Sequence, residues 1–513
     1  MSKMENNDVD CLVISYYFPP RLETSGLVVA RKIMEKNLHV DVIQSSYDES
    51  SDFNEIIDKY VNERFPIDIK SKPDYIPFIF EYINLGLKSI KKNYNKIYSR
   101  SYIYSNHFLA LEYKFNNPDV EWTAEFSDPL LLNLYDGKIK NYPRVILDNP
   151  DYIKKLNEKI ANFNKSNNTH FKDLDNPSNT FFIAEYLTFI FADKIIFTNE
   201  NQREVMLSVY DDEIRQIVEN KSIFEVHPTI DSEFYDYKDC GLELDDNYIN
   251  IAYFGTYYYI RHFEPLFYAF EALNHKYKDK IKFYFFTERD ELLKISTENL
   301  KISDNLIIEK PLNYFEFLNA TTKFDILLIN DTITKGNFKV NPFLPSKYSD
   351  YIGSGSDIWG ICENDSILSK KEFKYKSSMT DYKSSCDVLI SILNDNGYED
   401  SDCFFEDNIY EKRINELNWR FGLEFDERRK YYNQSIKLKE NNTKLRSEKQ
   451  ILFDKKEKLK SKNDILRQKN ENLKNKNEQL KKENKLLKAK YDEIINSNSW
   501  KITEPLRKFK KNK

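Results

Sequence analysis

Residues 11–26 read CLVISYYFPPRLETSG, and this stretch decides the fold. A short apolar run leads into a loop, and a helical pattern over residues 25–36 follows it. A strand, a loop and a helix in this order are typical of the βαβ units of a parallel sheet. Glycine is scarce in this chain, with 11 among 513 residues. Gly26 near the helix N-terminus therefore favours a close approach of backbone N–H groups to an anionic or hydroxylated ligand, although a simple turn glycine is the alternative.

The same alternation continues along the chain and predicts two α/β domains, divided by the polar stretch 236–247. We expect further strands of the first domain at 40–44, 96–99, 122–126 and 194–198, and strands of the second at 249–254, 281–286, 305–308 and 324–329. We expect further helices at 105–114, 263–273 and 314–320. The predicted domains cover residues 1–235 and 236–400.

The segment from residue 435 is rich in Lys, Asn, Glu and Leu, and leucine recurs at every seventh position as Leu438, Leu445, Leu452, Leu459, Leu466, Leu473, Leu480 and Leu487. A strict seven-residue repeat of this length predicts a coiled coil. With leucine at d, the a positions are Asn442, Lys449, Lys456, Asn463, Asn470, Asn477 and Asn484, and buried Asn favours a parallel two-stranded pairing. We expect a helical crossover segment over 401–434 and a parallel coiled coil over 435–495 that makes a homodimer. A solvated lone helix is the alternative.

A basic amphipathic tail is predicted for residues 496–513, where Trp500, Ile502, Leu506 and Phe509 lie among Lys and Arg. Such a segment suits an anionic membrane surface or an acidic partner, and a frayed tail is the alternative. Residues 436–513 hold roughly 25 Lys and Arg against roughly 11 Asp and Glu, although the whole chain has a net charge of −6. The rest of the chain is therefore strongly acidic, which argues against nucleic acid as a partner.

The N-terminal segment is acidic and lacks the basic start of a secretory signal, and no apolar run reaches the ~18 residues that a membrane span needs. We expect a cytoplasmic protein, with peripheral contact at the inner face of the cell membrane as the most that the sequence allows. Five cysteines occur singly, without a Cys-x-x-Cys pair, so neither a disulfide framework nor a zinc site is predicted.

Candidate ligand-binding residues follow strands of the second domain. AYFGTYYYIRHFEPL places Gly255 at a strand end and Arg261 just before a helix. In NPFLPSKYSDYIGSGSDIWG, a helix that opens at Lys347 puts Asp350 on the same face, one turn later. The lysine could meet a diphosphate while the carboxylate accepts hydrogen bonds from a ribose. No cluster of carboxylates or histidines suggests a metal, so fixed cations and helix N-termini would neutralise the diphosphate.

Several stretches together carry a family resemblance over residues 10 to about 360. They are, in chain order, SYYFPP and HVDVI, KIYSRSYIYSNHFLALEYK, WTAEFSDPL, FADKIIFTNENQREVM, VHPTIDSEFY, YFGTYYYIRHFEPLFYAFEAL and LPSKYSDYIGSG. The chain resembles the retaining glycosyltransferases of the family-four group. This resemblance implies the GT-B fold, in which two Rossmann-like domains face each other across a cleft.

The resemblance also implies roles for individual residues. On the donor side, Gly26 corresponds to the family's glycine loop, Arg261 and Lys347 to its basic pair on the diphosphate, and Asp350 to the acid that holds the ribose hydroxyls. On the acceptor side of the cleft, the residues implied are Arg100, Ser101, His107, Glu125 and Asp128, the last three as catalytic residues. Members commonly have Gly-Gly where this chain has Ser25-Gly26, and Glu where it has Pro342, so the sugar and the retaining outcome stay open.

The sequence thus predicts a metal-independent hexosyltransferase that moves a sugar from a nucleotide-diphosphate donor to a surface glycan, in particular a lipid-linked one. The nucleotide sugar is a co-substrate, and no cofactor is expected. A non-catalytic coiled-coil scaffold on a degenerate transferase fold is the main alternative. An epimerase that acts on a sugar nucleotide is a third hypothesis.

Overall fold

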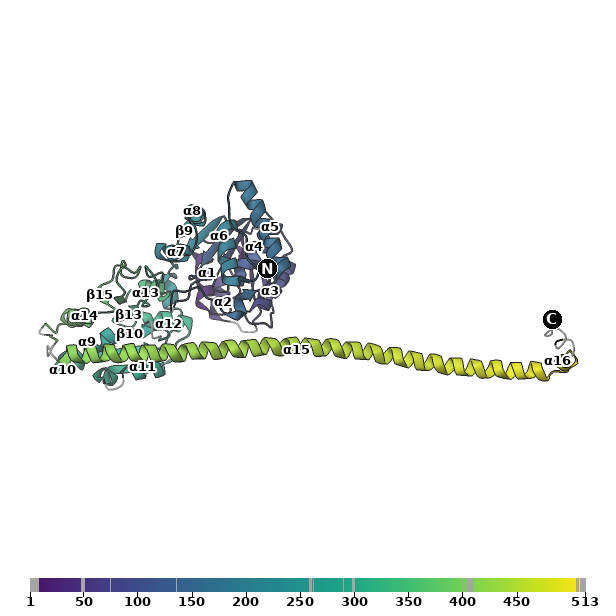
Figure 1. Cartoon of the computed structure of the whole chain (residues 1–513). Helices are drawn as coiled ribbons and strands as arrows, with labels where there is room; N and C mark the ends of the chain where they lie inside the picture. The colour runs from purple at the N-terminus through teal and green to yellow at the C-terminus, as the bar shows by residue number, and fades with distance from the viewer. Residues whose placement is uncertain are drawn as a thin grey trace. The chain divides into compact units, whose positions relative to one another are not determined.

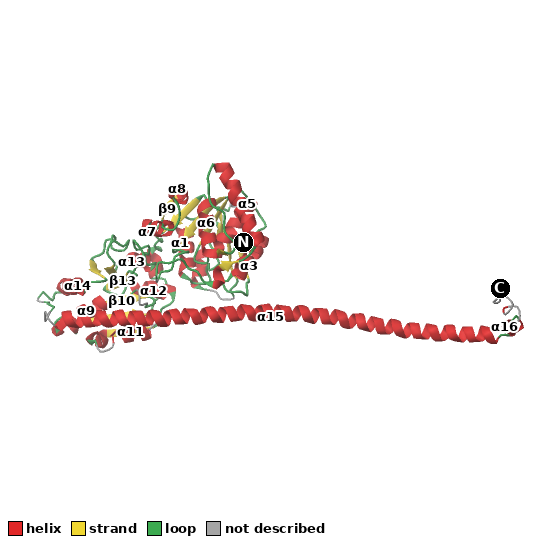
Figure 2. Ribbon diagram, in the orientation of Figure 1, coloured by secondary structure: helices red, strands yellow, loops and turns green. Residues whose placement is uncertain are grey.

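The computed structural model describes residues 9–47, 51–73, 75–134, 136–257, 261, 263–288, 290–297, 300–399, 401–403, 409–503 and 507. The chain divides into two compact units, Met1–Phe425 and Asp426–Lys513. The first unit holds two α/β lobes, each built on its own sheet (Figures 1 and 2). The second unit consists of most of one long helix and the C-terminal segment.

The N-terminal lobe is built on a parallel seven-stranded sheet in the order β3-β2-β1-β4-β5-β8-β9. Its strands are β1 (Cys11–Ile14), β2 (Val40–Ser45), β3 (Val61–Ile67), β4 (Lys96–Arg100), β5 (Glu121–Phe126), β8 (Lys194–Phe197) and β9 (Ser222–Phe224). A separate antiparallel pair is formed by β6 (Ile146–Leu147) and β7 (Ser178–Asn179). This strand order is that of doubly wound nucleotide-binding folds. The chain adds β2 and β3 on one side of β1, and then returns to add β4 and the later strands on the other side.

Helices cover both faces of this sheet because successive side chains of each strand point to opposite sides. Leu12 and Ile14 of β1 belong to one apolar cluster, and Val13 between them belongs to another. The helices of the lobe are α1 (Thr24–Glu35), α2 (Asp52–Ile57), α3 (Ile76–Ser89), α4 (Ser105–Asn116), α5 (Pro150–Asn167), α6 (Thr180–Phe191), α7 (Glu200–Leu207) and α8 (Asp212–Lys221), with short 3-10 turns η1 (Pro143–Val145) and η2 (Ser232–Tyr235). Residues of α3, α4 and α6 fill the first cluster, and residues of α1 and α2 fill the second.

The C-terminal lobe repeats this arrangement with a parallel six-stranded sheet in the order β12-β11-β10-β13-β14-β15. Its strands are β10 (Ile249–Phe254), β11 (Ile281–Phe286), β12 (Leu306–Glu309), β13 (Ile326–Asn330), β14 (Asp357–Cys362) and β15 (Tyr375–Ser378). Its helices are α9 (Glu264–Ala272), α10 (His275–Lys278), α11 (Asp290–Thr297), the 3-10 turn η3 (Lys301–Asn305), α12 (Tyr314–Thr321), α13 (Lys347–Ser354) and α14 (Tyr382–Asp395). The prediction of two Rossmann-like domains is therefore confirmed by both sheet orders.

The two lobes share an apolar contact. Phe53 of α2 and Phe315 of α12 stack with ring centroids 5.9 Å apart. Phe315 and Leu318 of α12 belong to the same buried cluster as β1 and α1 of the other lobe. Burial of these side chains joins the lobes into one unit and leaves the carboxyl ends of the strands near their boundary.

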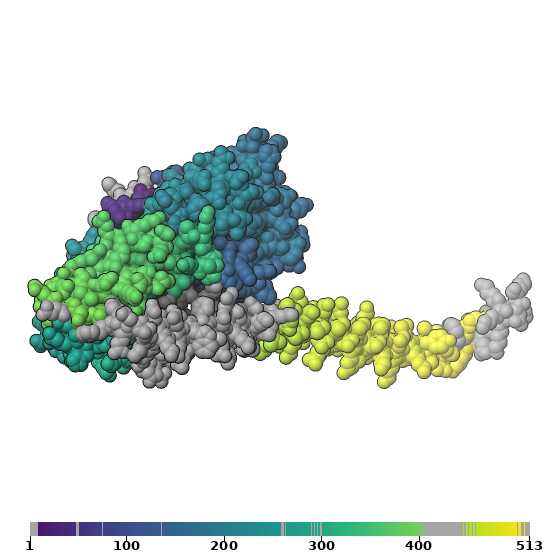
Figure 3. All heavy atoms as spheres, turned by 60° about the vertical axis from the view of Figure 1, so that its left-hand side comes forward, coloured from purple at the N-terminus to yellow at the C-terminus, as the bar shows by residue number. Residues whose placement is uncertain are grey.

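The C-terminal segment forms α15 (Ile409–Asn496), one continuous helix of 88 residues, followed by α16 (Asn498–Ile502). From residue 409 onward, the predicted crossover segment thus belongs to the same helix as the predicted coiled coil. The leucines of the seven-residue repeat, from Leu445 to Leu487, are 47–65% exposed. Figure 3 colours this part of the helix yellow-green to yellow. Of the predicted basic tail, residues 504–506 and 508–513, with Leu506 and Phe509, lie outside the described residues.

No helix in the part of the chain that the structure describes combines the length and the apolar character needed to cross a bilayer. Each strand predicted from the sequence occurs in the structure, whereas β3, β9, β14 and β15 were not predicted. Gly353 and Ser354 close α13, and only Gly355, with φ of 82°, lies in the left-handed conformation that ends a helix.

Candidate functional site

The site lies at the switch point of the strand order, where the chain begins to add strands on the other side of the first strand. Ligands of open parallel sheets bind beyond the carboxyl ends of the strands at that point. In the C-terminal lobe the switch point falls between β10 and β13. Gly255 follows β10 directly, and Asp331 follows β13 directly. Helix α13 begins at Lys347, as the spacing predicted, so Lys347 and Asp350 share its first turn.

Three of the predicted donor residues converge here. The Nζ atom of Lys347 lies 3.7 Å from the ring centroid of Tyr253. A Cβ atom on Gly255 would lie 2.9 Å from this Nζ, and Gly255 has φ of 136°, so the backbone of this loop passes directly beside the lysine. Arg261 donates from Nε to Oγ1 of Thr332 at 2.7 Å. Gly255, Arg261 and Lys347 are each partly exposed.

The protein that surrounds Lys347 lowers its pKa well below the ordinary value for lysine. The main cause is desolvation of the ammonium group, and the positive charge of Arg261 adds to it. The charges of Lys347 and Arg261 are thus coupled, and no carboxylate is among the groups that shift the lysine pKa, so an anion would stabilise this site.

Asp350 lies at the boundary of the two lobes and is 6% exposed. Its Oδ1 atom accepts hydrogen bonds from Nη1 of Arg31 at 2.7 Å and from the hydroxyl of Tyr314 at 3.4 Å. The hydroxyl of Tyr235 donates to the carbonyl oxygen of Asp350 at 2.6 Å. Burial raises the pKa of Asp350, and the charge of Arg31 opposes this rise. The acid predicted to hold a ribose is thus engaged by an arginine of the other lobe.

Asp128 of the N-terminal lobe is solvent-exposed. The surrounding protein raises the pKa of its carboxyl, while the charges of Arg100, Lys140 and Arg261 lower it. Because Arg261 belongs to the other lobe, Asp128 and the cationic cluster lie within electrostatic reach across the lobe boundary.

The other predicted acceptor-side residues form a buried network beneath this surface. Arg100 pairs with Glu125, and its Nε atom donates to Oγ of Ser25 at 2.9 Å. Glu125 also accepts from Nζ of Lys32 at 2.6 Å, and Ser101 accepts through Oγ from the backbone N–H of Ser127 at 3.0 Å. The buried polar groups of these side chains thus have hydrogen-bond or ion-pair partners within the lobe. The structure therefore corrects the expectation that Arg100, Ser101 and Glu125 line the cleft.

His107 is also buried, at 1% exposure, which corrects its expected place at the cleft. Its Nδ1 atom lies 2.8 Å from Oγ of Ser99, and its ring packs against Phe126 with centroids 5.0 Å apart. Desolvation, with a smaller contribution from the charge of Arg100, lowers the pKa of His107 to about 3. A neutral imidazole in this position packs the lobe rather than exchanging protons with a substrate.

Gly26 lies in the first turn of α1, and its role differs from the predicted one. A Cβ atom at this position would lie 1.7 Å from the carbonyl oxygen of Tyr17. The glycine therefore lets the loop after β1 pack directly against α1, so a packing requirement explains it without a ligand.

Asp331 is a buried carboxyl that no sequence pattern had indicated as a site residue. Its Oδ2 atom accepts hydrogen bonds from the backbone N–H of Glu363 at 2.9 Å and from Oγ of Ser366 at 2.5 Å. Its Oδ1 atom has no hydrogen-bond partner among the described residues. Burial raises the pKa of Asp331 to about 7, and Arg261 opposes this rise. The group therefore titrates near neutrality beside the cationic cluster.

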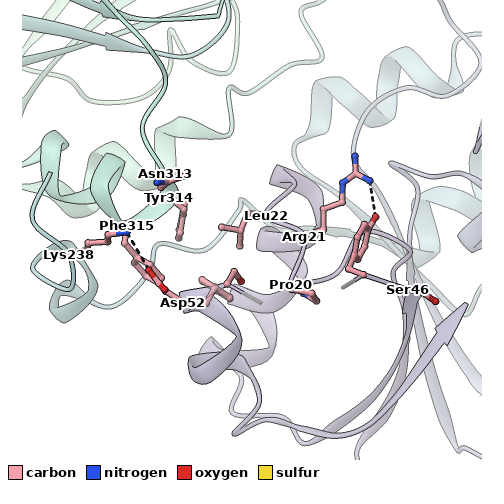
Figure 4. Close-up of a pocket in the computed structure, with 12 residues that line it drawn as sticks. Pro20, Arg21, Leu22, Ser46, Asp52, Lys238, Asn313, Tyr314 and Phe315 are labelled. Carbon is pink, nitrogen blue, oxygen red and sulfur yellow. Dashed lines mark hydrogen bonds and ion pairs between the residues drawn. The ribbon is translucent and has the colours of Figure 1, made fainter. Parts of the chain in front are cut away.

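A second feature of the lobe boundary is a cavity of about 740 Å³ (Figure 4). Its lining comes from the loops after β1 and β2 and from the start of α12, with Arg21, Tyr47, Asp52, Lys238 and Tyr314 as polar members. Nη1 of Arg21 donates to the Tyr47 hydroxyl at 2.8 Å, and Lys238 pairs with Glu316 at 3.1 Å. The cavity is therefore walled by aromatic rings and by charged groups that are already paired.

Arg31, Tyr235 and Tyr314 were missed because they are distant in sequence from Asp350, and Arg31 precedes its partner by 319 positions. A signal did exist, since Arg31 and Lys32 are charged residues in the apolar run of α1. Among the described residues, no group of three or more His, Cys, Asp and Glu side chains could hold a metal ion.

No protein-family model matches the chain, and no curated protein matches it. Solved structures with a similar overall arrangement include HepE of Anabaena in complex with UDP-glucose, with 9% identity over 76% of this chain and 90% of that chain and a TM-score of 0.46. Others are sucrose-phosphate synthase from Thermosynechococcus elongatus, with 10% identity, 76% and 90% coverage and a TM-score of 0.47, and a UDP-forming α,α-trehalose-phosphate synthase from Burkholderia xenovorans, with 8% identity, 74% and 91% coverage and a TM-score of 0.47. Similarity this low assigns no function, which has to be inferred from the site itself.

Proposed function

We propose that the protein is a glycosyltransferase that moves a hexose from a nucleotide-diphosphate donor to a glycan. The observation that carries this proposal is the convergence of Lys347, Arg261 and the glycine loop at Gly255 beyond the carboxyl end of β10. A diphosphate is the ligand that best fits two neighbouring cations beside an open backbone loop at the switch point of the strand order.

In this proposal the two cations stabilise the negative charge that develops on the leaving diphosphate, without a metal ion. Asp350 accepts hydrogen bonds from the ribose hydroxyls once Arg31 shares or releases its carboxylate. Asp128 acts on the sugar from the opposite lobe, since it is an exposed acid whose charge is coupled to that of Arg261. Retention of configuration is carried over from the family resemblance and belongs to the same proposal.

The cavity at Arg21 is the proposed acceptor site. Its aromatic side chains, Tyr47 and Tyr314, can pack against sugar rings, and its paired charges can hydrogen-bond hydroxyl groups. Because its cations already have anionic or hydroxyl partners, the cavity suits a neutral glycan better than a free anion. We assign a surface glycan, carried on a lipid at the inner face of the membrane, as the acceptor.

A scaffold without catalysis is the second proposal, and one observation favours it. The carboxylate of Asp350 is already bound by Arg31 and Tyr314, as expected if no nucleotide ever binds there. Pro342 in place of the family's Glu points the same way.

Replacement of Lys347 separates the two proposals. If the protein is a transferase, Lys347→Ala should abolish transfer or hydrolysis across a panel of nucleotide sugars, because the diphosphate loses its main counter-charge. Lys339→Ala removes an exposed lysine before α13 and should keep wild-type turnover. Circular dichroism and thermal unfolding would show that both variants fold. Equal turnover by both variants refutes the role of Lys347, and the lack of turnover and of nucleotide-induced stabilisation in the wild type supports the scaffold.

A further inference from the structure

The stretch 455–490 of α15 presents four parallel rows of side chains that no described residue covers. The central leucine row is made by Leu459, Leu466, Leu473, Leu480 and Leu487, which are 47–65% exposed. Leucines at a strict seven-residue spacing stay on one face only when a second helix packs along them. The leucine row is therefore an unpaired coiled-coil seam to which a second helix can bind.

The row beside it shows that this partner is a helix and not a lipid surface. It consists of Asn463, Asn470, Asn477 and Asn484, one per heptad, all exposed. A helix that lies in a membrane interface needs a broad apolar face with bulky anchors. A single leucine row flanked by amides is too narrow for that, whereas Asn at the a position pairs well with Asn of a facing helix.

Basic side chains flank the seam on both sides. On one side, the e positions hold Lys460, Arg467, Lys474, Lys481 and Lys488, and on the other side the g positions hold Lys455, Lys462, Lys469, Lys476 and Lys490, with Glu483 as the acidic exception. These basic rows are exposed. Acidic residues of the stretch, such as Asp464, Glu471 and Glu478, occupy outward b positions instead.

The basic rows oppose pairing with a second copy of this chain. In a parallel dimer each g side chain meets the e side chain five positions later on the partner helix. Lys455 would then meet Lys460, and Lys469 would meet Lys474, in both directions. An antiparallel dimer brings e rows together and g rows together, so like charges meet there as well, and the asparagines lose their matching partners.

The outward acids make a partner-free helix viable. Glu471 and Glu478 lie three positions before Lys474 and Lys481, a spacing that favours ion pairs within one helix. The helix can thus persist alone and offer its seam to another protein.

We propose that residues 455–490 bind an acidic amphipathic helix of another protein, with leucine at d, asparagine at a, and Glu or Asp at e and g. Opposite charges at the flanks then replace the like charges of the homodimer. This changes the expectation of a homodimer that the heptads alone suggested. The inference depends only on α15 and is independent of the proposed sugar transfer.

The test uses the full chain and two synthetic helices of about five heptads. Both carry Leu at d and Asn at a, one with Glu and the other with Lys at every e and g position. Fluorescence anisotropy should show binding of the Glu peptide only, and binding should weaken as salt rises, because screening removes the attraction between the flanks.

A charge-reversal variant sharpens the test. The combination of Lys460→Glu, Arg467→Glu, Lys474→Glu and Lys481→Glu should weaken binding of the Glu peptide by about tenfold or more, because the reversed e row then repels the acidic g row of the peptide. The matched control reverses outward lysines, Lys458→Glu, Lys482→Glu and Lys485→Glu, and should change the affinity by less than about twofold. Circular dichroism would confirm that both variants keep the helix.

Three outcomes would overturn the proposal. Sedimentation equilibrium could show the full chain as a dimer at micromolar concentration that the Glu peptide does not dissociate, which would make a second copy the occupant. Vesicles with phosphatidylserine could bind the chain while the Glu peptide does not, which would make a membrane the occupant. Equal effects of the seam and outward charge reversals would show that binding reflects overall charge alone.

Discussion

The ion pair between Arg31 and Asp350 gives the sharpest test of how the two lobes are joined. Its atoms are 2.7 Å apart, and the side chains are 2% and 9% exposed. At an effective dielectric constant of about 20, two charges at this distance attract by about 6 kcal/mol, most of which offsets their desolvation. Removal of one partner leaves an unpaired buried charge, which typically costs about 3–5 kcal/mol.

We therefore expect Arg31→Met and Asp350→Asn each to lower the free energy of unfolding by about 3 kcal/mol or more. The double variant should lose about 2–3 kcal/mol less than the sum of the two, because the second change removes the charge that the first leaves unpaired. Urea unfolding of the full chain, in a double-mutant cycle, measures this coupling.

The exposed pair of Lys374 and Asp357 is the matched control, with its atoms 2.7 Å apart and its side chains 47% and 42% exposed. Its cycle should give a coupling below about 1 kcal/mol. If the Arg31 and Asp350 changes prove additive within about 0.5 kcal/mol, the pair does not hold the lobes together in solution, and the reasoning fails.

Three further changes test the interior of the N-terminal lobe. Burial raises the pKa of Glu185 from 4.5 to about 7, so between these pH values the native state keeps a proton that the unfolded chain has lost, and stability falls as pH rises. Glu185→Gln should remove this loss of about 3 kcal/mol between urea unfolding at pH 4.5 and at pH 7, and an unchanged slope would contradict it. His107 has the opposite effect on the pH dependence of stability, because its lowered pKa of about 3 means that stability is lost as pH falls below 6.5. His107→Leu should therefore reduce the slope of stability against pH on the acid side by about 1.4 kcal/mol per pH unit. An acid unfolding midpoint equal to that of the wild type would contradict this. Gly26→Ala places a Cβ atom 1.7 Å from the Tyr17 carbonyl oxygen and should lower the free energy of unfolding by about 3 kcal/mol or more. Gly241, with φ of 67° and open space around it, is the control, and Gly241→Ala should lower it by about 1 kcal/mol. Equal melting temperatures of the two variants would disprove the steric argument.

The sequence predicted most of the strands that are buried on both faces. β10 reads INIAYF and is buried throughout, so the apolar run alone marks it. β3, with the sequence VNERFPI, lies at the sheet edge and is half exposed, and its charged residues hide the strand pattern. β14 was missed because Gly360 interrupts an apolar run. A Cβ atom at residue 360 would lie 2.6 Å from the Phe373 ring, so the glycine makes room for this aromatic side chain. Phe373 lies outside β14, so the sequence of the strand alone does not explain the glycine.

The site was predictable where spacing along one element decides it. Lys347 and Asp350 share a turn of α13, and three residues of separation were enough to place them together. The pairing of Arg31 with Asp350 depends on how two lobes meet, and the periodicity of either lobe contains no information on that. The burial of His107 likewise follows from the packing of α4 on the sheet, because a polar residue in a helix pattern looks the same at a surface and in a core.

The lowered pKa of Lys347 has a consequence for ligand binding. An arriving diphosphate would raise this pKa again by supplying negative charge. At a pH where part of the ligand-free amine is deprotonated, capture of such a ligand is accompanied by proton uptake from the buffer. The measured heat of binding would therefore change with the ionisation enthalpy of the buffer, and the affinity would rise as the solution is acidified.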